Sequence, residues 1–306
     1  AASVALIFDL KTFQPWSQVT SLWNETDDIS ELVGHFHFPR FIVAYPGLLL
    51  EDMAEGVGFS VYVSLFVATN AVVFRKICMR ARRRPPPAWV WLVFFAAHFA
   101  MNGRGAIGWT GWLLCVYVCV ASDSRLAAKG ISGTLKLFLI PVSLFLSSVT
   151  TGIFVATLTS FALLLVVRRL AGFWNFRIRL TVGSMLIYGL MVVALPVVAV
   201  LAADYLVDGL NKALAFYGGG LEGVLGMATH VFGRLTANPL TAMAVLMLAG
   251  MGAFMSWLLA YQHKRNRSLL VLTAIPVAGG VFGYTILTLA IPVWLISMTP
   301  QNRGKP

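Results

Sequence analysis

Long apolar stretches, separated by short clusters of positive charge, are the feature of this sequence that most restricts its fold. Only 11% of the 306 residues are Asp, Glu, Lys or Arg, and 58% are hydrophobic. The cations cluster between the apolar stretches, at residues 75–84, 168–179 and 264–267. Apolar runs of roughly 20 residues with basic connectors are typical of a polytopic membrane protein, and the connectors indicate its cytoplasmic side.

The acidic residues lie mainly at the beginning of the chain. Eight of the twelve fall within the first 55 residues, in a segment that also contains aromatic residues and histidines. We expect residues 1–56 to form an acidic, interfacial segment on the outer face of the membrane. Residues 57–306 are expected to form a transmembrane helical domain.

Two apolar pieces within this first segment are too short for membrane spans. Residues 1–8 lack the basic start of a signal peptide and would suit the tail of a helix that begins earlier; the sequence leaves this open. In residues 41–50 the apolar run is interrupted by Pro46 and Gly47. This second piece predicts an interfacial or re-entrant segment.

The charge and the cysteines exclude several other classes of protein. A net charge of +11 would suit a nucleic-acid-binding protein, but the cations flank apolar spans and form no continuous stripe. Contact with anionic lipid headgroups explains them better. Cys115 and Cys119 share one apolar run, and Cys78 lies in a basic connector. Neither these cysteines nor His35 and His37 form a set of metal ligands, so we expect no metal or other cofactor.

The apolar runs predict an all-α fold with about eight transmembrane helices. The first clear span covers residues 57–74. Residues 88–122 and 131–167 are each too long for one span, which needs roughly 20 residues, and they predict two tight helical hairpins. The tips of these hairpins are expected near residues 102–105 and 147–152, on the outer side.

The second half of the chain continues this pattern. We expect spans at residues 180–203 and 237–261, with the outer loop 204–236 between them. That loop alternates apolar and small residues, which is typical of amphipathic helices lying along a membrane surface. Residues 268–298 form either one long tilted span or two short ones divided at residues 279–280.

This topology gathers several ionisable residues on the outer side. Ionisable groups in or beside a membrane are costly, so their presence suggests a function. Arginine binds phosphate oxygens through paired hydrogen bonds, and imidazole or carboxylate groups can deprotonate a sugar hydroxyl. We therefore predict a site for a lipid-linked phosphorylated substrate. Its candidate residues, from separate segments, are Arg40, His98, Arg104, His230 and Arg234.

Arg104 is the leading candidate, because it lies between Gly103 and Gly105, where the backbone permits the close approach of a ligand. An interfacial arginine that extends to lipid headgroups is the alternative interpretation. His98 lies six residues earlier, which is not the same face of one helix. It joins the site only if the chain bends near Asn102, and a histidine hydrogen-bonded between packed helices is the more ordinary interpretation.

Two further groups could contribute to this site. Glu51 and Glu55 are four residues apart and would share one face of a helix. They could act as paired catalytic carboxylates, or they could lie in a solvated turn that a helix dipole stabilises. Thr150 and Thr151, at the tip of the second hairpin, could bind sugar hydroxyls or satisfy free backbone groups at the helix ends.

Three stretches between residues 55 and 170 carry a family resemblance. In HFAMNGRGAIGWTGWLL (98–114), an Arg-containing turn follows one apolar helix and opens the next. LSSVTTGIFVATLTSFALLLVVRR (146–169) contains a Ser/Thr- and Gly-rich helix start, and EGVGFSVYVSLFVATNAVVF (55–74) contains a Gly-Phe helix opening. Together these features resemble the bacterial surface-polysaccharide polymerases of the O-antigen (Wzy) type.

The resemblance implies polymerisation or transfer of an oligosaccharide carried on undecaprenyl diphosphate, at the outer face of the bacterial cytoplasmic membrane. Arg104 would bind the diphosphate or stabilise the leaving group, and His98, Glu51 or Glu55 would act on the acceptor hydroxyl. The candidate substrate-binding residues are Arg40, Arg234, His230, Thr150 and Thr151. Such polymerases are usually longer and have more spans, and residues 204–236 are a modest counterpart of their large outer loop.

Two non-enzymatic functions remain open. The chain could be an integral subunit of a secretion, conjugation or export assembly, since its small-residue face at Ala242, Ala249 and Ala253 suits close packing with partner membrane proteins. It could instead be a transporter or channel with helices broken near residues 102–105 and 279–280. The scarcity of acids in the expected spans argues against a buried proton or cation relay.

Overall fold

The computed structural model describes residues 13–25, 38–99, 101–122, 133–170, 267–279 and 288–299, with residues 211, 215, 219 and 220. All of the regular structure in these ranges is helical, so the prediction of an all-α fold is confirmed for this part of the chain. The helices are α2 (Ser17–Glu25), α4 (Phe38–Met53), α5 (Gly58–Arg82), α6 (Ala88–Phe99), α7 (Gly103–Ser122), α8 (Gly133–Ser147), α9 (Thr151–Leu170), α13 (Arg267–Gly279) and α15 (Ala290–Met298).

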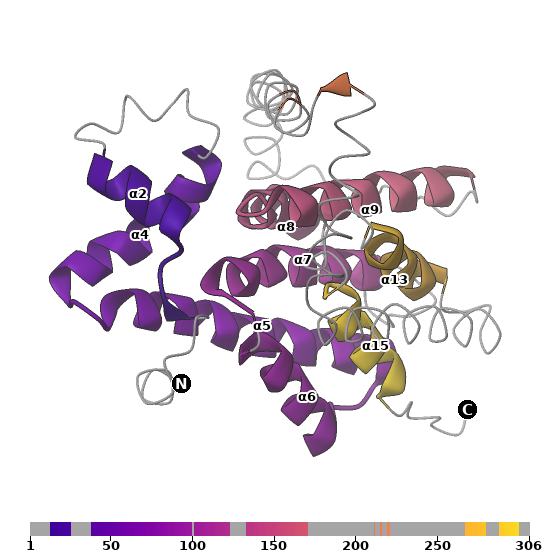
Figure 1. The fold of residues 1–306 in the computed structure, drawn as a ribbon. Coiled ribbons are helices and arrows are strands. Elements are labelled where there is room, and N and C mark those ends of the chain that lie inside the picture. Colours follow the sequence, from indigo (N-terminus) through magenta and orange to yellow (C-terminus); the bar gives the residue numbers. More distant parts are fainter. Residues whose placement is uncertain are drawn as a thin grey trace, which may run out of the picture.

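Helix α7 is the centre of this arrangement. Figure 1 shows α8 and α9 on one side of α7 and α5 and α6 on the other. Helices α2 and α4 form a lobe where α5 begins, and α13 and α15 lie toward the opposite end. Helices α5 and α7 each contain an 18-residue apolar stretch. In α7, 83% of that stretch is buried inside the protein, whereas in α5 only 39% is buried. Helix α7 is therefore surrounded by protein, whereas α5 exposes a large apolar surface.

Two of the described helices, α5 and α7, are long and apolar enough to cross a membrane. This is fewer than the sequence pattern predicts. The apolar helix α6 has 12 residues, or roughly 18 Å, which is shorter than a hydrocarbon core of roughly 30 Å. The first leg of the first hairpin therefore does not reach across a membrane. The predicted spans 180–203 and 237–261 lie outside the described residues.

Both predicted hairpins break where the sequence indicates. Helix α6 ends at Phe99 and α7 begins at Gly103, after Asn102, whose side-chain oxygen accepts the N–H of Gly105 at 2.9 Å. This contact satisfies one of the free N–H groups at the start of α7. Helices α8 and α9 separate at residues 148–150. The last apolar run also divides, since α13 ends at Gly279 and α15 begins at Ala290.

One expected interruption is absent. Helix α4 runs through Pro46 without ending, although proline removes one backbone hydrogen bond. The hydroxyl of Tyr62 donates to the carbonyl oxygen of Val43, in the turn that precedes this proline. Residues 41–50 therefore belong to a continuous helix of 16 residues, which packs on α5 and is still shorter than a span.

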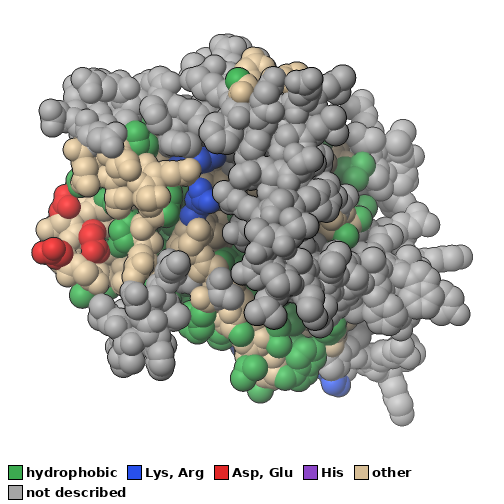
Figure 2. Space-filling view, viewed as in Figure 1, with side chains coloured by type: hydrophobic (Ala, Val, Ile, Leu, Met, Phe, Trp, Pro, Cys, Tyr) green, Lys and Arg blue, Asp and Glu red, His purple; other side chains and the backbone are tan. Residues whose placement is uncertain are grey.

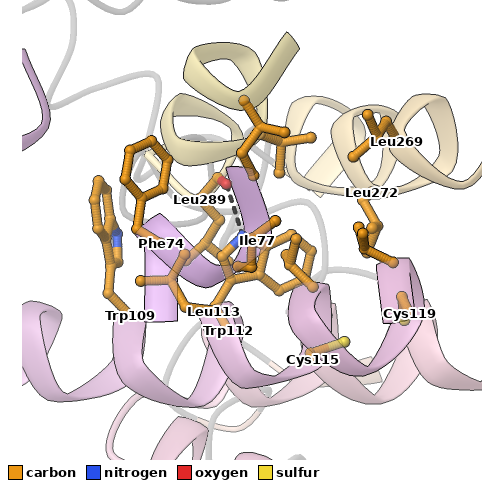
Figure 3. Close-up of a cluster of buried hydrophobic side chains, with 14 of the residues drawn as sticks. Phe74, Ile77, Trp109, Trp112, Leu113, Cys115, Cys119, Leu269, Leu272 and Leu289 are labelled. Atoms are coloured by element: carbon orange, nitrogen blue, oxygen red, sulfur yellow. Dashed lines mark hydrogen bonds between the residues drawn. The ribbon is translucent and has the colours of Figure 1, made fainter. Parts of the chain in front are cut away.

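The buried side chains form two main clusters. The lobe cluster joins α2 and α4 to the first half of α5 and the start of α7. It includes Phe41, Phe59, Val63, Val67, Ala106 and Ile107. The core cluster joins the second half of α5 to the rest of α7 and to α6, α9, α13 and α15. Figure 3 shows part of it, including Phe74, Ile77, Trp109, Trp112, Leu113, Leu269, Leu272 and Leu289.

The division of residues between the clusters shows that α5 and α7 run in the same direction. The first halves of both helices meet in the lobe cluster and the second halves meet in the core cluster. The indole N–H of Trp112 donates to the carbonyl of Leu289 at 2.8 Å (Figure 3). This bond ties α7 to the residue that precedes α15, and it satisfies a polar atom inside an apolar cluster.

The packing of α7 on α8 depends on a glycine. The Ser143 hydroxyl donates to the carbonyl of Gly111 at 2.6 Å. A Cβ atom at position 111 would lie 2.5 Å from the backbone nitrogen of Ser147 and 2.6 Å from the carbonyl oxygen of Ser143. Only glycine permits this close backbone approach, which is common between packed membrane helices.

We predict that Gly111→Ala destabilises the protein by about 2 kcal/mol, because the added methyl group meets backbone that cannot rotate away. Gly108→Ala is the matched control on the same helix. There the added Cβ meets the terminal methyl of Ile153 at 2.6 Å, which a rotation of that side chain relieves. Thermal unfolding in detergent measures both variants, and equal melting temperatures would contradict the packing described here.

Helix α5 continues for two turns beyond the predicted end of its span at residue 74. The reason lies in Arg82, which is buried and caps α15: its Nε donates to the carbonyl of Ile296 at 2.9 Å and its Nη2 to that of Ser297 at 3.0 Å. A cation at the last turn of a helix also interacts favourably with the helix dipole. Helix α5 ends at Arg82, and the next residue, Arg83, has a left-handed backbone with a φ of 58°, two residues before the three prolines 85–87.

We expect Arg82→Ala to lower stability by about 2 kcal/mol, because it leaves two carbonyl groups of α15 without their charged donor. Arg83→Ala, which removes the same charge from an exposed position, should have little effect. Hydrogen exchange followed by mass spectrometry reports on residues 290–299 directly. Equal protection of this segment in the two variants would refute the capping role of Arg82.

Candidate functional site

Arg40 and Arg104 meet at the side chain of Gln18. The Nη1 of Arg40 donates to the Oε1 of Gln18 at 3.2 Å, and the Nη1 of Arg104 donates to the same oxygen at 3.0 Å. Because the Nη1 atoms of Arg40 and Arg104 bind the same oxygen, the distance between them cannot exceed the sum of these two hydrogen-bond distances. The structure thus brings together two of the predicted site residues, which are 64 positions apart in the sequence.

Three helices position this arginine pair. Arg104 lies in the first turn of α7, directly after the turn capped by Asn102. Arg40 lies in the first turn of α4 and is 8% exposed. Helix α2, which carries Gln18, is held against α4 by Trp23, whose ring stacks on Phe41 at 6.2 Å and meets Tyr45 edge-on at 5.6 Å. Aromatic packing therefore holds the helix that carries Gln18 against the helix that carries Arg40.

This arrangement contains two kinds of group that bind anions, guanidinium groups and a helix N-terminus. Two guanidinium groups lie close together, and both donate to the side-chain oxygen of Gln18. Arg104 also stands at the N-terminus of α7, where free N–H groups carry a partial positive charge. Guanidinium groups and helix N-termini both bind phosphate oxygens, and two guanidinium groups suit a ligand with more than one negative charge.

His98 lies near this pair but in a separate, fully buried hydrogen-bond group. Asn70 donates through its Nδ2 to the Nε2 of His98 at 2.9 Å and to the carbonyl of Ala106 at 2.9 Å. The Nδ1 of His98 then donates to the carbonyl of Phe94 at 3.1 Å. The ring also contacts Trp109, with 4.7 Å between centroids. Both ring nitrogens are thus engaged in joining α5, α6 and α7.

Glu51 binds the beginning of α5. One carboxylate oxygen accepts the N–H of Gly56 at 2.8 Å and the other accepts that of Phe59 at 2.7 Å. These are N–H groups that a helix start leaves free, and the negative charge interacts favourably with the dipole of α5. Glu55 lies in the turn after α4, which ends at Met53, and is exposed. The expectation that Glu51 and Glu55 share a helical face is therefore wrong.

We predict that Glu51→Gln lowers the free energy of unfolding by about 1 kcal/mol. The glutamine side chain keeps one of the two acceptor oxygens and loses the negative charge. Glu55→Gln, which removes the same charge four residues later, should leave the melting temperature unchanged. Both variants are compared by thermal unfolding at neutral pH. A larger loss of stability in Glu55→Gln than in Glu51→Gln would contradict the geometry of this turn.

The remaining candidate residues lie away from the arginine pair or outside the described part of the chain. Thr150 directly precedes α9, and its carbonyl accepts the N–H of Phe154 at 3.0 Å. Thr151 is the first residue of α9. His230 and Arg234 fall outside the described residues. Among the residues that the structure does describe, no group of three or more His, Cys, Asp or Glu side chains is placed to hold a metal ion.

Two residues of this region are not among the sequence-based candidates. Asn70 is a lone amide inside the apolar run of α5, and a polar residue in such a run is a signal that could identify it. Gln18 gives no comparable signal, because it is an ordinary polar residue on a short helix. Only the packing of α2 against α4 places Gln18 between the two arginines.

Comparison of the chain with protein-family models, with characterised proteins and with solved structures gives no match. The resemblance to the O-antigen polymerases therefore stays a prediction. The arginine pair at Gln18 is the feature of the described structure that bears most directly on function.

Proposed function

We propose that this chain is a multi-pass protein of the bacterial cytoplasmic membrane that binds the diphosphate of a lipid-linked oligosaccharide through Arg40 and Arg104. The observation that carries the proposal is the convergence of these two side chains on one oxygen, that of Gln18. The reaction that it serves is polymerisation or transfer of the oligosaccharide, as in the family that residues 98–114 resemble.

The exposed surface of α5 supports a location in the membrane. Val61, Leu65 and Val72 are 43%, 61% and 55% exposed, and their spacing of four and seven residues places them on one stripe of the helix. Hydrophobic side chains also cover α6 in Figure 2, where Leu92 is 72% exposed. Apolar surface of this extent is costly in water and is the surface that lipid tails solvate.

The charges at the two ends of α5 support one orientation. Arg75 and Lys76 are exposed near its C-terminal end, which the positive-inside rule assigns to the cytoplasm. Glu51 and Glu55 lie at the opposite end, and Figure 2 shows acidic side chains gathered there. The lobe of α2 and α4 would then face outward, on the side where a lipid-linked oligosaccharide is elongated.

The depth of the arginine pair also fits this proposal. Asn70 is the midpoint of α5, and it contacts Ala106, two residues after Arg104. The pair would therefore lie below the outer end of α5, at the level of the exposed Gln18. Charged residues at such a depth are rare and usually serve function.

The contacts of His98 and Glu51 limit what is proposed for catalysis. Both groups are already engaged in joining or capping helices. The proposal therefore gives the arginine pair the central role, as a clamp for the diphosphate that stabilises the negative charge of a departing carrier lipid. The partners of the protein would be the lipid-linked glycan, surrounding lipids and further membrane proteins.

We predict that Arg104→Gln weakens binding of undecaprenyl diphosphate about tenfold or more, because one of two charged donors is lost. Arg104→Lys should weaken binding of undecaprenyl diphosphate similarly. The ammonium group of lysine lacks the planar pair of N–H donors with which a guanidinium group binds two oxygens at once. The measurement is native mass spectrometry of the detergent-solubilised protein titrated with undecaprenyl diphosphate. Undecaprenol, which lacks the phosphates, serves as the reference ligand.

Arg75→Gln is the matched control, because it removes one positive charge from an exposed position at the other end of the membrane domain. Equal binding by Arg104→Gln and Arg75→Gln would contradict a site at the arginine pair. In cells, Arg104→Gln should also abolish long chains of surface polysaccharide. The alternative is that Arg104→Gln leaves the polysaccharide chains at their wild-type length, while the purified complex loses a partner membrane protein. That result would favour the assembly-subunit function instead.

A further inference from the structure

One face of α4 is both apolar and exposed. Leu49, Leu50 and Met53 are 40%, 37% and 82% exposed, and Pro46 is exposed as well. Their spacing of three, one and three residues places these four side chains on one stripe of the helix, the α4 stripe. The opposite face of α4 is buried in the lobe cluster. Helix α4 is therefore held by the protein on one side, and its other side presents an apolar surface to its surroundings.

Exposed apolar side chains also follow in the turn after α4 and along α5. Val57, Val61 and Leu65 are 38%, 43% and 61% exposed. The two helices pack closely against each other here, since a Cβ atom at Gly58 would overlap the carbonyl oxygen of Leu50. The apolar surface that α5 presents to lipid in the proposed function therefore has a neighbouring surface of the same character on α4.

The charges around the α4 stripe indicate what kind of lipid it contacts. The one cation of α4 is Arg40, which is 8% exposed. The exposed charges nearby are negative: Asp52 lies beside the stripe, and Glu55 lies in the turn that follows. Helices that bind anionic lipid surfaces are instead rich in Lys and Arg on their polar face. The stripe therefore fits the hydrocarbon of lipids whose headgroups have no net charge.

We propose that the α4 stripe is inserted among the acyl chains of net-neutral lipids in the outer leaflet. Helix α4 has 16 residues, or roughly 24 Å, which suits a helix that enters one leaflet without crossing the bilayer. This inference rests on the membrane location and orientation in the proposed function, and it does not depend on binding of the diphosphate. It adds an outer-leaflet anchor for the lobe that carries Arg40.

Fluorescent labels on single added cysteines test this inference in the full chain. Leu49→Cys and Met53→Cys carry a bimane label, and the native cysteines at positions 78, 115 and 119 are buried and should label poorly. The protein is placed in phosphatidylcholine vesicles that contain phosphatidylcholine with a nitroxide on its acyl chain. We expect strong quenching of both labels by the nitroxide. Quenching by iodide should be severalfold smaller than at Asn24→Cys, an exposed polar position on α2.

Three results would overturn the inference. Strong quenching by iodide would mean that the α4 stripe faces water. Protection from both quenchers would mean that a second copy of the chain covers it. Loss of nitroxide quenching in native membranes fused with the same vesicles would mean that a partner protein covers it. Addition of phosphatidylglycerol should not increase the nitroxide quenching, and an increase would refute the preference for net-neutral lipids.

Two further variants distinguish failure of this inference from failure of the proposed function. Leu65→Cys places the same label on the exposed stripe of α5. If this label is quenched by the nitroxide and those at positions 49 and 53 are not, only the inference fails. If none of the three is quenched, the membrane location fails and the proposed function fails with it. Reaction of Asp52→Cys with an impermeant maleimide only after cells are broken would refute the orientation, and with it both proposals.

Discussion

The side chain of Asn70 sets the level at which three helices of this protein meet. Its amide nitrogen donates to His98 on α6 and to the carbonyl of Ala106 on α7, so it fixes where α6 stops and α7 starts along α5. Asn70 lies between the lobe cluster and the core cluster, in a region where unsatisfied polar groups are costly. The position of Arg104 follows from this contact, because Arg104 lies two residues before Ala106.

The arginine pair depends on a second structural unit, the lobe of α2 and α4. The lobe packs on the first half of α5, beside the level at which the turn between α6 and α7 ends. This arrangement brings Arg40 opposite Arg104 and leaves Gln18 between them. Packing of α2 and α4 against α5 thus holds Arg40 near Arg104. Preorganised cations of this kind bind an anion without a large rearrangement of the protein.

For the described residues, the sequence predicts the all-α class and the breaks near residues 102 and 148, because apolar runs and local capping residues such as Asn102 determine them. It does not predict the lengths, since only α5 and α7 are long and apolar enough to cross a membrane. It also identifies Arg104, since an arginine between glycines is conspicuous in an apolar run. It does not predict that α5 extends to Arg82, because the carbonyl that this residue binds is 214 positions away. Nor does it predict the position of Gln18, which depends on packing between helices. For Glu51, one of the two interpretations drawn from the sequence, a turn that a helix dipole stabilises, agrees with its contacts at the start of α5.

The convergence of α4 and α7 at the arginine pair is the central claim, and thiol cross-linking in native membranes tests it most directly. An Arg40→Cys/Arg104→Cys double variant is treated with a short bifunctional maleimide, and the linked peptides are identified by mass spectrometry. The native cysteines at positions 78, 115 and 119 are buried and should react poorly. We expect a link between positions 40 and 104, and none between positions 40 and 55 in the corresponding Glu55→Cys variant. Failure to link 40 to 104, with both thiols reactive toward a single maleimide, would contradict the account.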